Sequence, residues 1–190
     1  MPVFIRAFVC IEIPEEERKK IASVLSLLKK EYPNLKWVAP SGLHVTLKFC
    51  GELQEDQLQL FSFSLEKSLG EAVTKPFQIR LGSIGGFPSL RSPRVLWVGV
   101  SEGAPVLEEL KNIVEASGFS AGLEKEERPF HPHLTLARIR YGKGVPQELE
   151  ERLKKIDFSG LRWEAHQMIL MRSQLRPEGP FYTPLETYSL

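Results

Sequence analysis

The sequence predicts an α+β protein with two pseudo-symmetric lobes, each an antiparallel-type sheet with flanking helices, around a central cleft. Two observations lead to this prediction. Short β-branched and aromatic runs alternate with segments of helical periodicity, and the order strand, helix, strand, helix, strand occurs twice along the chain. A shift of 89 residues, the separation of His44 from His133, lays each element of the first half on its counterpart. Residue identity barely repeats, so the halves share organisation and not a tandem sequence.

The first half begins with an apolar run at 3–13, which predicts a strand. Pro14 and three glutamates then start a helix that ends at Pro33. A strand at 44–49 follows a Pro-Ser-Gly loop. The next helix carries four apolar residues on one face and ends at Gly70, and a strand is predicted at 77–81. The apolar positions of this helix are Leu58, Phe61, Leu65 and Leu69.

The second half repeats the order after a turn-rich join at 85–93. Strands are predicted at 95–100, 133–139 and 163–171. One helix starts at Pro105 and ends at Gly118, and another starts at Pro146. We therefore expect a single domain, 1–190, with lobe-forming halves at about 1–84 and 94–172 and a C-terminal strand at 181–190.

Composition narrows the functional classes. The 190 residues are 42% hydrophobic and 26% charged, which excludes disorder as the main state. A net charge of +1 argues against a protein that coats nucleic acid non-specifically. Only Asp56 and Asp157 are aspartates, whereas metal-dependent phosphohydrolases usually gather several around their ions.

Cysteine usage and the termini favour a cytoplasmic protein. Cys10 and Cys50 lie in apolar runs, and we expect reduced residues in or near the core. No signal peptide or membrane-spanning segment is apparent, and no coiled-coil heptads appear, so a monomer is expected.

A doubled motif carries the chemistry. The sequence HVTL at 44–47 is matched by HLTL at 133–136, at corresponding places in the two halves. In a strand each histidine shares a face with the threonine two residues later, roughly 6.6 Å along the chain, and the aliphatic residues take the other face. One such motif is usually an ordinary sheet face, but two independent copies should occur in only about 2% of chains.

These residues suit in-line attack on a phosphodiester. His44 and His133 supply a general acid and a general base near neutral pH, whereas the hydroxyls of Thr46 and Thr135 can bind non-bridging phosphate oxygens. An activated cyclic diester needs no metal, and no metal or cofactor is expected. Spacing alone leaves the acid and base roles interchangeable.

The chain resembles the 2H phosphoesterases, and within them the RNA 2′,3′-cyclic phosphodiesterases, also called LigT-like 2′-5′ RNA ligases. The resemblance covers nearly the whole chain and rests on five stretches: 4–9 (FIRAFV), 37–51 (WVAPSGLHVTLKFCG), 86–100 (GFPSLRSPRVLWVGV), 128–138 (RPFHPHLTLAR) and 171–182 (MRSQLRPEGPFY). It implies that His44 is the proton donor to the departing O3′ and His133 the proton acceptor that activates water, leaving a 2′-phosphomonoester on RNA.

The resemblance to this family implies roles for two further residues, which lie at corresponding places after the two histidine motifs. Arg138 is expected to contact phosphate, although simple alternation puts it on the face opposite His133, so a bulge, a strand end or a long reach is required. Phe49 holds the corresponding place in the first half and is a candidate for base stacking or for the core.

Two alternatives to RNA hydrolysis stay open. The same site could act on another cyclic phosphate, such as an ADP-ribose cyclic phosphate or a small cyclic nucleotide, or the chain could be a non-catalytic RNA-end binding module. A 2′-5′ ligation without ATP is a secondary expectation, because no ATP-binding motif is present.

The other histidines and a group of cations are weaker candidates. His131 and His166 lack partners that would make a metal site, and structural roles are expected for both. A local basic rim for RNA is a further hypothesis. Its members are Arg91, Arg94, Arg138, Arg140 and Lys143.

Overall fold

A computed structural model describes residues 4–72, 74–139, 145–177 and 179–190. The predicted order of strands and helices is confirmed, with two short additions, β2 and the 3-10 helix η1. The elements are β1 (Phe4–Glu12), α1 (Glu15–Glu31), β2 (Lys36–Trp37), η1 (Pro40–Gly42), β3 (His44–Gln54), α2 (Glu55–Ala72), β4 (Phe77–Phe87), β5 (Val95–Glu102), α3 (Ala104–Ser120), β6 (His133–Arg138), α4 (Gln147–Lys154), β7 (Arg162–Ala165), β8 (Gln167–Arg176) and β9 (Gly179–Ser189).

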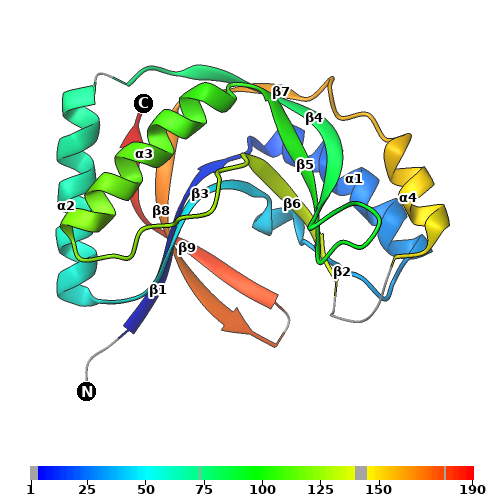
Figure 1. Cartoon of the computed structure of the whole chain (residues 1–190), viewed down its shortest axis with the longest axis horizontal. Coiled ribbons are helices and arrows are strands. Elements are labelled where there is room, and N and C mark those ends of the chain that lie inside the picture. The colour runs from blue at the N-terminus through cyan, green and yellow to red at the C-terminus, as the bar shows by residue number, and fades with distance from the viewer. Residues whose placement is uncertain (1–3, 73, 140–144, 178) are drawn as a thin grey trace.

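The strands form one curled antiparallel sheet in the order β7-β4-β5-β6-β3-β1-β8-β9, with β2 also paired to β6. Its two wings, β7-β4-β5-β6 and β3-β1-β8-β9, join where β3 pairs with β6 (Figure 1). The α+β architecture of two related antiparallel lobes is therefore confirmed.

The two halves of the chain exchange strands, so that strands from the end of each half pair with strands of the other half. Strand β4 follows α2 in the first half, yet it pairs with β5 and β7 of the second half. In the same way β8 pairs with β1 of the first half. The two wings are thus held together by exchanged strands as well as by the β3–β6 contact.

Helices cover one face of the sheet and leave the other open. α2 and α3 contact each other and β3, while α1 and α4 lie over the other wing (Figure 1). Ile21, Leu25 and Leu28 form the buried face of α1, as their spacing predicts. Within the described parts of the chain, no helix combines the length and apolarity needed to cross a bilayer.

Three boundaries differ clearly from the prediction. Strand β3 runs to Gln54 instead of ending at 49. Strand β4 continues through Gly85 and Gly86, which the sequence predicts to be part of the turn-rich join. The Trp97 indole occupies the space that a side chain at position 85 would need, which explains the glycine there. The strand predicted at 163–171 is two strands, β7 and β8, separated at His166. Both cysteines are free, with Cys10 buried and Cys50 half-buried, as expected.

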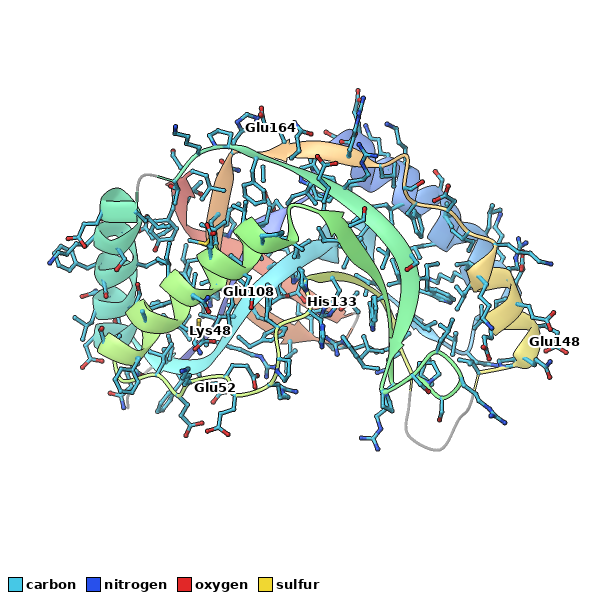
Figure 2. All side chains as sticks on the ribbon, turned by 45° about the horizontal axis from the view of Figure 1, so that its top comes forward. Lys48, Glu52, Glu108, His133, Glu148 and Glu164 are labelled. Atoms are coloured by element: carbon cyan, nitrogen blue, oxygen red, sulfur yellow. The ribbon has the colours of Figure 1, made fainter. Side chains whose placement is uncertain are left out.

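A buried ion pair fastens β3 to α3 beneath the open face. Lys48 Nζ lies 2.8 Å from Glu115 Oε2 and donates a second hydrogen bond to the Glu124 carbonyl. Both side chains are almost inaccessible to water. Figure 2 shows Lys48 beside α3, away from His133. A buried charge that loses its partner is far more costly than a pair replaced by apolar groups.

Lys48→Met should therefore lower the free energy of unfolding by about 3–5 kcal/mol, because Glu115 is left buried without a cation. Adding Glu115→Leu should restore most of that loss. Urea unfolding followed by circular dichroism measures both. Lys67→Met is the matched control, since the Lys67–Glu71 pair is exposed and worth at most about 0.5 kcal/mol. A double variant as unstable as Lys48→Met would contradict this account.

Candidate functional site

The doubled motif meets at one residue pair in the middle of the sheet. Val45 of β3 lies directly opposite Leu134 of β6, and both are fully buried. Continuing the antiparallel register by one residue places His44 opposite Thr135, and Thr46 opposite His133. Since neighbours in a strand alternate faces, all four side chains occupy the open face, and each is half-buried. The structure therefore brings together the four residues predicted from the motif.

The two histidines are diagonal neighbours in this arrangement, which puts their Cα atoms roughly 7–8 Å apart. Their charges influence each other, because His133 is among the groups that lower the pKa of His44. Figure 2 shows His133 near the centre of the molecule, where the two wings join.

Aromatic rings hold His44 in place. Its imidazole stacks on Phe8 at 4.8 Å between centroids and meets Tyr182 edge-on at 5.4 Å. A hydrogen bond to the backbone at Gly42 fixes the ring on its other side. These contacts come from β1, β9 and η1, so three elements orient one side chain.

His133 has a closely related environment on the other wing. Phe87 meets its ring edge-on at 5.2 Å, and Trp97 lies at 6.1 Å. Its Nδ1 is 2.6 Å from the His131 carbonyl oxygen. A carbonyl only accepts hydrogen bonds, so Nδ1 carries the hydrogen and neutral His133 presents an unprotonated Nε2.

Both imidazoles favour the neutral form. The pKa of His44 is lowered to about 4, mainly by burial and to a smaller extent by Arg138 and His133. Burial also lowers the pKa of His133, and the nearby Arg138 acts in the same direction. The backbone hydrogen bonds at Gly42 and His131 oppose these effects but do not cancel them.

A β-bulge brings Arg138 to the open face. Leu96 pairs with Ala137 but Trp97 pairs with Thr135, so β6 carries one extra residue, Leu136. Leu136 and Ala137 are consequently both buried, and alternation resumes with Arg138 exposed on the same face as His133. Simple alternation gave the wrong face because one sequence cannot reveal a bulge.

An equivalent bulge in β3 brings Phe49 to the open face. Val9 pairs with Lys48 and Cys10 with Thr46, which leaves Leu47 as the extra residue. The Phe49 side chain is 62% exposed, with its ring 6.1 Å from Phe8. This exposure excludes the core as the place of Phe49, one of the two roles that the sequence left open.

Among the weaker candidates that the structure describes, only the His131 backbone and Arg138 are part of this site. His166 pairs with Glu164 at 3.2 Å, and His131 contributes its carbonyl to His133. No group of three or more potential metal ligands occurs among the residues that the structure describes. Of the proposed basic rim, Arg91, Arg94 and Arg138 are exposed, whereas Arg140 and Lys143 lie outside the described residues.

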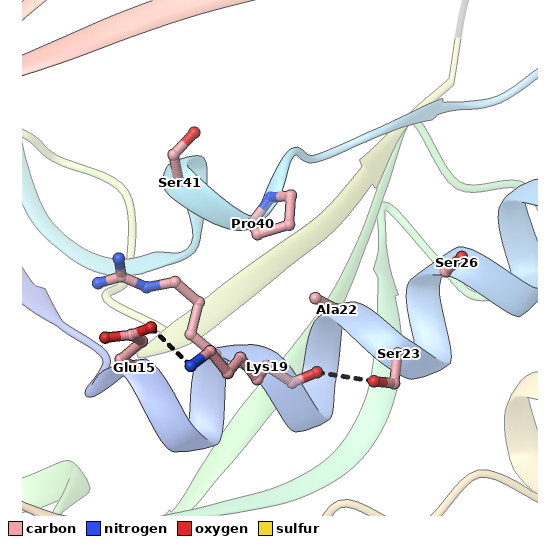
Figure 3. Close-up of a pocket in the computed structure, with 8 residues that line it drawn as sticks. Glu15, Lys19, Ala22, Ser23, Ser26, Pro40 and Ser41 are labelled. Carbon is pink, nitrogen blue, oxygen red and sulfur yellow. Dashed lines mark hydrogen bonds and ion pairs between the residues drawn. The ribbon is translucent and has the colours of Figure 1, made fainter.

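A hollow beside α1 is distinct from the histidine site. It lies between the first turns of α1 and η1 (Figure 3), and its lining includes none of the six predicted site residues. Lys19 Nζ forms an ion pair with Glu15 Oε1 at 2.7 Å, and the Ser23 hydroxyl donates a hydrogen bond to the Lys19 carbonyl. Arg18, which also lines the hollow, donates from Nη2 to the Ile13 carbonyl at 2.7 Å, while its Nε has no hydrogen-bond partner among the described residues.

The aromatic residues around the histidines were missed in the sequence. Phe8 and Trp97 are separated by the same 89 residues as the histidines, so applying the shift to every aromatic residue would have found this pair. Phe87 and Tyr182 have no such relation and are brought to the site only by the exchange of strands.

Comparison with known proteins places the chain in a family. Residues 15–176 match the model of the 2′-5′ RNA ligase superfamily. The chain belongs to this superfamily. It is 35% identical over 179 residues to an RNA 2′,3′-cyclic phosphodiesterase of Aquifex aeolicus, covering 90% of this chain and 92% of that one. A protein of the same name from Methanothermobacter thermautotrophicus is 30% identical, covering 98% and 99%.

Solved structures share the fold of this chain. E. coli LigT complexed with 3′-AMP superposes with a TM-score of 0.77 at 26% identity, covering 99% of both chains. The protein TT0787 of Thermus thermophilus also gives 0.77, at 29% identity and 98% coverage of both chains. The resemblance seen in the sequence is therefore confirmed for the family and for the fold.

The site geometry predicts the titration of both histidines. Because burial disfavours the charged imidazolium, both rings should be neutral at pH 7. His44 should titrate near pH 4 and His133 below 6.5, with neutral His133 as the Nδ1–H tautomer. Long-range ¹H–¹⁵N NMR measures both properties, and His44→Gln and His133→Gln assign the signals. A midpoint at or above 6.5, or an Nε2–H tautomer for His133, would refute the proposed environment.

Proposed function

We propose that this protein hydrolyses RNA 2′,3′-cyclic phosphate ends to 2′-phosphomonoesters by two-histidine acid–base catalysis without a metal. The observation that carries the proposal is the arrangement of two imidazoles and two hydroxyls on one face of the β3–β6 pair. Family membership and the names of the relatives support the same reaction.

In the proposed reaction, the phosphoryl group lies over Thr46 and Thr135, whose hydroxyls donate to its non-bridging oxygens. Nε2 of His133 accepts a proton from water as the water oxygen attacks phosphorus. The P–O3′ bond breaks, and His44 donates its proton to O3′. The products are a 2′-phosphate and a free 3′-hydroxyl.

The hydrogen-bonded tautomer of His133 supports its role as the base, because Nε2 is the nitrogen left without a proton. The acid role of His44 needs a charged ring, although burial disfavours one. A bound phosphodiester supplies negative charge beside that ring, which favours the imidazolium. The substrate therefore helps to protonate its own acid catalyst.

Phe49 and Arg138 support a defined orientation of the RNA end. The exposed ring of Phe49 offers a surface on which the terminal base stacks, next to Phe8 and His44. The guanidinium of Arg138 binds phosphate from the opposite wing. A 5′-hydroxyl of a second RNA in place of water would give a 2′-5′ linkage by the same bond changes, without ATP.

The decisive experiment offers a nucleoside 2′,3′-cyclic phosphate and identifies the product by ³¹P NMR. We expect the 2′-phosphate, formed equally well with EDTA present. His44→Ala and His133→Ala should each lower turnover by about 10²–10⁴-fold while the circular dichroism spectrum is retained.

Four outcomes would overturn this function. Near-normal turnover in both histidine variants would exclude the mechanism, and a strict metal requirement would favour another kind of phosphodiesterase. Binding of cyclic-phosphate RNA without any product would instead identify a binding module. Faster turnover of other cyclic phosphates than of RNA ends would show that the substrate is not RNA.

The lowered pKa values also predict the pH dependence. For kcat/KM, which reports the free enzyme, both limbs of the bell should lie below pH 6.5. For kcat, which reports the substrate complex, the alkaline limb should lie at higher pH, because the bound phosphate raises the imidazole pKa values. Steady-state rates from pH 3.5 to 9 provide the measurement. A kcat/KM that stays constant up to pH 8 would contradict the prediction.

A further inference from the structure

Two cations lie directly opposite each other at the edge of the proposed site. Lys36 of the short strand β2 pairs in register with Arg138 of β6, so both side chains occupy the same face of the sheet. Their neighbours Trp37 and Ala137 form the adjacent pair and pack toward the core. Lys36 and Arg138 therefore both point to the open face that carries His133.

No described carboxylate neutralises either cation. Neither Lys36 nor Arg138 forms an ion pair with a described acidic residue, although many other exposed basic side chains of the chain do. Like charges in directly opposite positions of an antiparallel pair destabilise the sheet. A lysine and an arginine held together without an acid form a site that an anion would stabilise.

The position of this pair indicates which anion it binds. Arg138 is close enough to lower the pKa of both His44 and His133, so the pair continues directly from the reacting centre. A guanidinium has five donors and can reach two phosphates. The compact ammonium of Lys36 lies on β2, which pairs with β6 beyond the point where β3 does, and so lies further along β6 from the histidines. The pair thus extends the site by one more phosphate group.

We propose that Lys36 and Arg138 bind the phosphodiester on the 5′ side of the terminal nucleotide, so that the enzyme prefers RNA strands over mononucleotides. This inference rests on the function proposed above and adds Lys36, a residue that the doubled motif does not include. The substrate class is then RNA of at least two nucleotides, in which a charged phosphodiester linkage precedes the nucleotide with the cyclic phosphate.

The experiment compares two dinucleotides that both end in a 2′,3′-cyclic phosphate. One has an ordinary phosphodiester linkage, and the other has an uncharged methylphosphonate at that position. The wild-type kcat/KM should be about tenfold higher for the charged dinucleotide, the size expected for a charge-assisted hydrogen bond. Lys36→Gln should bring this ratio close to one, while Lys36→Arg should retain most of it.

Lys75→Gln is the matched control, because Lys75 is an exposed lysine in the segment between α2 and β4. It makes the same change in net charge and should leave the ratio unaltered. Thermal unfolding separates binding from structure: Lys36→Gln should hold or raise the melting temperature, since it removes a repulsion. A clear fall in melting temperature would show that Lys36 supports the fold, and would overturn the inference.

Equal rates on the two dinucleotides in the wild type, or an equal loss on both in Lys36→Gln, would also overturn the inference while the proposed hydrolysis stands. If the wild type hydrolyses neither dinucleotide, the proposed function fails. Binding titrations with the same two dinucleotides would then decide the inference, because Lys36→Gln should weaken binding of the charged one only.

Discussion

The geometry of the site depends on a single pairing, that of Val45 with Leu134. Each residue is the apolar member between a histidine and a threonine, and each is fully buried. Because side chains alternate along a strand, burying these two residues turns all four polar neighbours to the opposite face. A slip of one residue in either strand would send an imidazole into the core and a leucine or valine to the surface, which is strongly disfavoured. The hydrophobic core therefore specifies the register of the polar site, and no contact among the polar groups themselves is needed for this.

The same pairing explains how a symmetric scaffold can serve an asymmetric substrate. The halves match closely at the centre of the site. Each histidine forms a hydrogen bond with the backbone of the residue two positions before it, and each lies against an aromatic ring from the neighbouring strand. They diverge after equivalent bulges, where β3 presents Phe49 and β6 presents Arg138. An aromatic ring on one wing and a cation on the other suit the two parts of a nucleotide, its base and its phosphate. For the proposed reaction, the symmetry would supply the paired acid and base, and the divergence after the bulges would set the orientation of the nucleotide.

The features of this site that depend on local sequence patterns could be predicted from the sequence. Periodicity predicted the strands and helices, and the repeated motif predicted the four central residues, because both follow from the alternation of side chains along a chain. It missed features that depend on contacts between distant segments. The strand exchange that brings Phe87 and Tyr182 to the histidines is one example. The extra residues in β3 and β6 are another, since a bulge is defined by the partner strand. Strand β2 is only two residues long, too short for any periodicity, and Lys36 was missed for that reason.

The surroundings of His44 combine two opposing requirements. The aromatic rings that orient the imidazole also exclude water, and this exclusion makes the charged form costly. Arg138 adds to that cost, although a cation near the site helps to bind phosphate. A bound anion offsets both costs, because its negative charge attracts the imidazolium as well as the guanidinium. In the free protein both histidines therefore favour the neutral form, and under the proposed mechanism the charged His44 would arise only with substrate bound. In the proposed reaction, a site of this kind would favour protonation of His44 when a phosphate is bound, and would thereby link the recognition of a cyclic end to the proton that O3′ receives.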